Sequence, residues 1–159
     1  MTQARSERFD TRATCEAQFV ACLQAVQATL DLFDPDFAVF PLGATGVDVL
    51  LRAFLARGGR LRLALHETRH IERHYPRFLR LLRDYAHLCE CRVTPRSLHQ
   101  LTDSFCIADS RHIVRRFHSD HLRGEAAFDN PPACDLSAHR FEAIWTESRT
   151  ALQPTTTGL

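Results

Sequence analysis

Short strand-like segments alternate with amphipathic helical segments along most of this 159-residue sequence, and this alternation limits the fold more than any other feature. Residues 47–55 carry apolar side chains at helical spacing, and Gly58 and Gly59 end that helix. Residues 60–65 then place leucine at every second position, which is the period of a strand. The order of segments predicts an α/β fold, with a mixed sheet flanked by helices on both faces.

The same patterns give bounds for the other elements. The predicted helices span residues 13–30, 47–55, 76–85 and 135–150, and the predicted strands span residues 37–40, 60–65, 91–95, 104–108, 112–117 and 125–128, with a tight turn at 109–111. We expect residues 9–150 to form a single domain. Residues 1–8 are then an N-terminal tail and residues 151–159 a C-terminal tail.

The charged residues exclude several kinds of function. All 20 basic residues are arginine and 19 residues are acidic, so the net charge is +1. Without lysine the chain has neither a Schiff-base lysine nor a lysine that holds phosphate. The N-terminus has no apolar signal segment and no apolar run could span a bilayer, so we expect a cytoplasmic protein that does not bind membranes. The six cysteines are then expected to be reduced thiols, and no cofactor is predicted.

One histidine-rich segment matches a zinc-binding pattern. His66, Glu67 and His70 fit HExxH, in which two histidines one helical turn apart bind zinc and the glutamate acts as a base on water. His74, four residues further on, is a third potential ligand. A zinc-dependent hydrolase is therefore one alternative function. The pattern requires a helix from the first histidine onward, whereas the residues directly before it have the period of a strand.

A second segment concentrates cationic side chains on a predicted hairpin. Four arginines and three histidines lie within thirteen residues: Arg111, His112, Arg115, Arg116, His118, His121 and Arg123. Guanidinium groups suit the geometry of phosphate, because they donate two parallel hydrogen bonds. We therefore predict a binding site for a phosphorylated ligand or nucleic acid, made by Asp109 and the four arginines.

Residues 104–114, 125–130 and 141–145 carry a family resemblance. Together with the order of helices and strands from about residue 9 to residue 149, they resemble the phospholipase D-like superfamily, in particular a bacterial branch found alone or fused to GNAT-type acetyltransferases. The resemblance implies a phospholipase D-like half-unit, since active members use two copies of an HxKxxxxD motif, in one chain or in a dimer. It therefore implies a homodimer, and an acetyltransferase is a candidate partner protein.

The resemblance also implies that the catalytic motif is degenerate. Placing its aspartate on Asp109 puts the lysine position at Ser104 and the histidine position at Thr102, so the nucleophile and the phosphate-binding lysine are both replaced. We accordingly expect a non-catalytic module with a binding or regulatory role rather than an enzyme. The second alternative is a phosphodiesterase of atypical design, in which His99 or His112 acts near Asp109.

Overall fold

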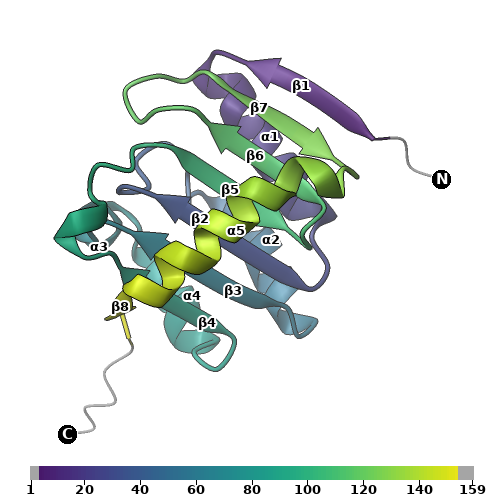
Figure 1. Cartoon of the computed structure of the whole chain (residues 1–159). Helices are drawn as coiled ribbons and strands as arrows, with labels where there is room; N and C mark the ends of the chain where they lie inside the picture. The colour runs from purple at the N-terminus through teal and green to yellow at the C-terminus, as the bar shows by residue number, and fades with distance from the viewer. Residues whose placement is uncertain (1–3, 154–159) are drawn as a thin grey trace, which may run out of the picture.

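An eight-stranded mixed sheet forms the centre of the computed structural model, which describes residues 4–153 (Figure 1). The strands are β1 (Arg5–Phe9), β2 (Thr29–Asp34), β3 (Arg60–Leu65), β4 (Cys89–Val93), β5 (Ser104–Ala108), β6 (His112–Arg116), β7 (Gly124–Phe128) and β8 (Arg149–Ala151). Their order across the sheet is β1-β7-β6-β5-β2-β3-β4-β8. Strands β2, β3 and β4 are parallel to one another, and every other neighbouring pair is antiparallel.

Helices cover both faces of this sheet, as the sequence predicted. The helices α1 (Arg12–Ala25), α2 (Thr45–Ala56) and α4 (Pro76–Asp84) lie on one face, and α5 (Pro131–Glu147) crosses the other face diagonally (Figure 1). Two shorter elements, α3 (Arg69–His74) and the 3₁₀ helix η1 (Arg96–Leu98), lie in the connections that follow β3 and β4. The predicted α/β fold with a mixed sheet is therefore confirmed.

Each face of the sheet has its own apolar layer, because successive strand residues point to opposite sides. On β2, Leu30 and Leu32 join the larger cluster beneath α1, α2 and α4. Phe33 points to the other side and packs with Phe105 and Phe141 beneath α5. Which face a side chain reaches therefore follows from its position along the strand.

The first helix and the first internal strand differ from the prediction. Helix α1 ends at Ala25, not at residue 30, and the strand runs over residues 29–34 instead of 37–40. Leu30 fits the helical spacing of the preceding residues, but it also begins an alternation with Leu32 that suits a strand between two apolar layers. Phe37 and its neighbours instead form a buried loop after Pro35.

Both ends of the chain add edge strands that the sequence did not predict: β1 lies mostly in the predicted N-terminal tail, and β8 covers the predicted end of the last helix and the first residue of the C-terminal tail. Strand β1 pairs with β7, and β8 pairs with β4. Residues 1–3 and 154–159 of the predicted tails lie outside the described residues. Helix α5 begins at Pro131 rather than near residue 135, because the Asn130 side chain accepts a hydrogen bond from the Ala133 amide and caps the helix.

The predicted hairpin of β5 and β6 is present. Strand β5 covers residues 104–108, and β6 ends one residue before its predicted end. Asp109 and Ser110 in the turn both have φ of 57°, which is the left-handed conformation of both central residues of a type I′ turn. No helix within residues 4–153 is both long and apolar enough to cross a membrane.

Candidate functional site

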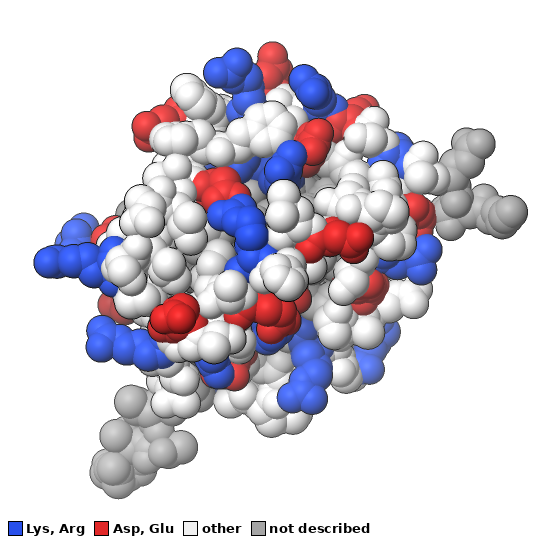
Figure 2. All heavy atoms as spheres, viewed as in Figure 1, with Lys and Arg blue, Asp and Glu red and all other residues white. Residues whose placement is uncertain are grey.

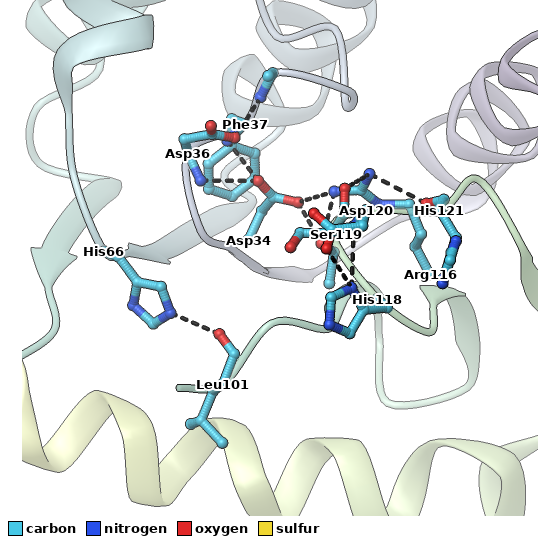
Figure 3. Close-up of polar contacts among 12 residues, drawn as sticks. Asp34, Asp36, Phe37, His66, Leu101, Arg116, His118, Ser119, Asp120 and His121 are labelled. Atoms are coloured by element: carbon cyan, nitrogen blue, oxygen red, sulfur yellow. Dashed lines mark hydrogen bonds and ion pairs between the residues drawn. The ribbon is translucent and has the colours of Figure 1, made fainter. Parts of the chain in front are cut away.

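Three polar side chains form a row across adjacent strands at one end of the sheet. Arg116 of β6 is opposite Ser104 of β5, and the pairing of Phe33 with Phe105 puts Asp34 of β2 beside Ser104. All three residues are buried, and they lie on the face that α1 covers, since they share strand parity with Leu32 and Val114. We call this set the polar row; Figure 3 shows the contacts of Asp34 and Arg116.

Asp34 is the centre of the polar row. Its Oδ1 accepts hydrogen bonds from the Ser104 hydroxyl and from Nη2 of Arg116, the latter over 3.1 Å. Its Oδ2 accepts from the amides of Asp36 at 2.9 Å and Phe37 at 2.5 Å. Burial raises the pKa of this carboxyl above its ordinary value, and the hydroxyl, the two amides and the guanidinium all oppose that rise. Four donors on two oxygens are the pattern of a carboxylate held in its ionised form.

Arg116 links the polar row to the β6–β7 loop, residues 117–123. While Nη2 contacts Asp34 and Ser104, Nη1 donates to the carbonyl oxygens of Ser119 at 3.2 Å and His121 at 3.4 Å (Figure 3). The side chain is 3% exposed, and its Nε has no hydrogen-bond partner. The guanidinium is therefore already held by the protein's own carboxylate and carbonyl groups.

The three motif positions named by the family resemblance lie at two different ends of β5. Thr102 and Ser104 lie at the start of the strand, at the polar row, and Asp109 lies in the turn after its end. The Asp109 carboxylate accepts hydrogen bonds from three consecutive backbone amides, those of Gln27, Ala28 and Thr29, at 2.7–3.0 Å. Asp109 therefore connects the backbone at the start of β2 to the hairpin turn by hydrogen bonds.

The predicted phosphate site is divided in the same way. Arg111 lies at the turn with Asp109 and pairs with Asp129 at 3.2 Å. Arg116 lies at the other end of β6, four residues from His112 and so about 13 Å away along the strand. Arg115 and Arg116 point to opposite faces, and Arg115 pairs with Glu125 at 2.7 Å. These five side chains do not converge on one ligand.

Arg123 is placed differently from the other three arginines of the hairpin. It is exposed at the end of the β6–β7 loop and forms no ion pair within the described part of the chain. It lines a surface pocket with Arg8, Phe117 and His121. This pocket is the part of the predicted phosphate site that the structure leaves open to a ligand.

The HExxH segment does not form one helix. His66 lies in the bend after β3, and α3 begins only at Arg69, so His66 and His70 are not one turn apart on a helix. The Nε2 of His66 lies 2.6 Å from the carbonyl oxygen of Leu101, so it must donate, and Nδ1 then accepts from the Thr94 hydroxyl. Within residues 4–153, no three histidine, cysteine or acidic side chains are grouped as metal ligands.

The other candidate histidines occupy structural positions. The His99 ring lies 4.7 Å from that of His66, at the end of the sheet away from Asp109. His112 lies near the turn, where its Nδ1 accepts from the Asp129 amide at 3.0 Å. Desolvation lowers the pKa of His66 and of His112 below the ordinary value, so both rings are held neutral. The rings of His70 and His74 on α3 contact each other at a tilt of 44°, with their centroids 4.6 Å apart.

Burial raises the thiol pKa of five cysteines, namely Cys15, Cys89, Cys91, Cys106 and Cys134. All six cysteines are free, and five of the six are buried. Burial raises the pKa of Cys15 to about 11 and that of Cys89 to about 12. A thiol with a raised pKa is a poor nucleophile at neutral pH.

Asp34 is the site residue that sequence reasoning missed. In the sequence it precedes a proline within an Asp-Pro-Asp string, which marks the end of a strand and nothing more. Its partners lie 70 and 82 residues away, so the polar row exists only once β2, β5 and β6 are adjacent. A local signal was available only in the pair Ser104 and Arg116, which a hairpin prediction places opposite each other.

Across the α5 face of the molecule, acidic and basic side chains are interspersed, and the described residues form no large patch of one sign (Figure 2). Ion pairs such as those of Arg62 with Asp31 and with Glu142, and of Arg140 with Asp103, account for part of this pattern. This face therefore offers little general attraction for polyanions.

The comparison with protein families assigns most of the chain to one family. Residues 11–153 match the protein family described as "Domain of unknown function (DUF7931)". Among curated proteins no sequence matches the chain.

Solved structures give the more informative likeness. The phospholipase D family member Nuc from Salmonella typhimurium is similar with a TM-score of 0.71 and 11% identity, over 94% of this chain and 99% of that one. NucT from Helicobacter pylori is similar with a TM-score of 0.66 and 7% identity, over 94% and 100%. TrmBL2, described as an archaeal chromatin protein with a novel mode of DNA binding, is similar with a TM-score of 0.70 and 11% identity, over 92% of this chain and 54% of that one. These likenesses establish a phospholipase D-like fold.

Proposed function

Since this chain belongs to the DUF7931 family and has a phospholipase D-like fold, we propose that it is a non-catalytic module of that fold which binds a phosphorylated ligand or nucleic acid. The polar row of Asp34, Ser104 and Arg116 is the observation that supports the loss of catalysis. The β6–β7 loop supports the binding role, because it carries the unpaired Arg123.

The polar row closes the place where the family resemblance puts the catalytic lysine. Ser104 at that position is fully buried, and its hydroxyl is committed to Asp34. A phosphate group approaching this point would meet the Asp34 carboxylate, whose negative charge disfavours a second anion. Arg116 cannot serve as the missing cation, since its charge already balances Asp34. The site therefore lacks a free cation for the phosphate.

The histidine position of the motif also lacks a nucleophile. Thr102 stands where the resemblance places the histidine that would form a phosphohistidine intermediate. The neighbouring His66 has both ring nitrogens engaged, by Thr94 and by the Leu101 carbonyl. A hydrolytic reaction would thus have to recruit His99, which lines a different pocket, together with Arg96, Arg149 and the acidic Glu147.

Binding without catalysis is supported by a second observation. TrmBL2, whose similar fold covers half of a longer chain, is described as binding DNA. Arg123 gives this chain an exposed cation at the same end of the sheet as the polar row. A homodimer, an acetyltransferase partner and a cytoplasmic location stay predictions from the sequence.

The proposal is tested by a hydrolysis assay. Purified protein is incubated with bis(para-nitrophenyl) phosphate and with labelled single-stranded DNA, beside an active nuclease of the phospholipase D family as positive control. We expect no product above the rate without protein. Turnover that persists in EDTA and disappears in His99→Ala would overturn the proposal in favour of an atypical phosphodiesterase.

A further inference from the structure

A pocket of about 430 Å³ opens between the end of β1 and the β6–β7 loop. In Figure 1 this is the region where the β6–β7 loop projects beyond the sheet. Its size lies within the range of pockets that hold small-molecule ligands. The side chains that give the pocket its chemistry are Arg8, Asp10, Phe117, His121 and Arg123.

The pocket has free positive charge. Arg8 and Arg123 are both exposed, and neither forms an ion pair with a carboxylate of the described residues. Asp10 is the one acidic residue of the lining, against two arginines and one histidine. Arg115 and Arg116 on the adjoining strand are neutralised by their own partners. An anion attracted to this region is therefore directed to Arg8 and Arg123.

The pocket also exposes an aromatic ring. Phe117 is 43% exposed, although most of the large apolar side chains of this protein are buried. The guanidinium of Arg115 lies 5.1 Å from the centroid of its ring. An exposed aromatic ring beside arginines is the arrangement on which proteins stack the bases of single-stranded nucleic acid.

The walls of the pocket are fixed in place before any ligand binds. The Phe117 amide donates to the Arg123 carbonyl at 3.0 Å, and Arg116 holds the carbonyl groups of Ser119 and His121 from inside the protein. At Gly124 a Cβ atom would lie 2.0 Å from the carbonyl oxygen of Arg115, so only glycine allows this close approach. A preorganised pocket loses less conformational entropy on binding.

We propose that this pocket binds a short segment of single-stranded nucleic acid, with one base stacked on Phe117 and the neighbouring phosphates between Arg8 and Arg123. The inference rests on the binding role of the proposed function, and it specifies the ligand class. A duplex does not fit this arrangement, because its bases are already stacked on each other and cannot lie against the ring.

The test is fluorescence anisotropy with a labelled oligothymidylate at several salt concentrations. Phe117→Ala should raise Kd by about five-fold to about 150-fold, the usual loss for one stacked base. Arg123→Ala should weaken binding and reduce the slope of log K against log[salt] by about 0.7, the contribution of one phosphate contact on a single strand. Phe117→Trp should retain binding, because indole also stacks.

Arg80→Ala is the matched control, since Arg80 is exposed on α4, outside the pocket, and forms no ion pair within the described residues; this variant should leave Kd within about two-fold. The inference is overturned if Phe117→Ala and Arg123→Ala bind as the unmutated protein does, or if the unmutated protein prefers duplex DNA. Equal binding of base-free polyphosphate would likewise overturn it. Hydrolysis of the probe would refute the non-catalytic proposal alone, whereas absence of binding without hydrolysis would refute this inference alone.

Discussion

Replacing Arg116 by methionine should cost more stability than any other arginine substitution on the β5–β6 hairpin. Methionine keeps much of the length of the side chain but removes its charge, so Asp34 would stay buried without a counter-ion. Arg116 is 3% exposed and Asp34 is 0% exposed, and breaking such a buried pair from one side costs about 3–5 kcal/mol. This loss is a large part of the roughly 5–15 kcal/mol by which a domain of this kind is stable.

The measurement is the free energy of unfolding from urea denaturation, with Arg115→Met as matched control. Arg115 is the neighbouring residue on the same strand, but its pair with Glu125 is at the surface, with side chains 34% and 32% exposed. That substitution should cost at most about 1 kcal/mol. The double variant Asp34→Asn/Arg116→Met removes both charges and should cost less than the two single substitutions summed. It also keeps the test usable if Arg116→Met alone does not fold. A cost below about 1 kcal/mol for Arg116→Met, or strict additivity in the double variant, would refute the reasoning.

Three further predictions concern His66, Gly124 and the predicted zinc site. Burial lowers the pKa of His66 in the folded protein below the unfolded value of about 6.5. Below about pH 6.5 the unfolded chain therefore binds more protons than the folded protein, so stability should fall as the pH drops. The fall should be less steep in His66→Gln. Thermal unfolding between pH 5 and pH 8, about the range in which histidine titrates, measures both slopes, and equal slopes would contradict the assignment. Gly124→Ala should lower the free energy of unfolding by about 1–3 kcal/mol, because the added methyl group meets the backbone of Arg115; an unchanged urea midpoint would show that the loop yields easily. Elemental analysis of the untagged protein should find far less than one zinc per chain, and stoichiometric zinc lost in His70→Ala would restore the hydrolase alternative.

The parts of the fold that sequence patterns predicted are those with strong local signals. The hairpin of β5 and β6 has strands of alternating side chains and a turn in which Asp109 adopts the left-handed backbone conformation. The predicted bounds of both strands were therefore correct to one residue. Leu30 satisfied a helical and a strand pattern at once, and only the apolar layers on both faces of β2 decide between them. Local periodicity contains no information on that choice.

The candidate site was harder to predict from the sequence, for a related reason. A count of arginines on a hairpin does not show which of them meet a carboxylate, because the carboxylates come from other strands: Asp34 from β2, Glu125 from β7. The cationic segment was visible in the sequence, but the neutralisation of Arg115 and Arg116 depends on long-range register. Arg8, the second free cation of the pocket, belongs to a segment that the sequence assigned to a tail.

The ion pair in the polar row also restricts how this protein could evolve. If a lysine replaced Ser104, its ammonium group would enter a buried space where the Arg116 guanidinium now lies 3.3 Å from the Ser104 hydroxyl, and the two cations would repel each other. If Arg116 were lost first, Asp34 would be left uncompensated in the core. Each order of substitution thus passes through a destabilised intermediate, and this epistasis would tend to keep the lineage from acquiring a lysine at this position one residue at a time.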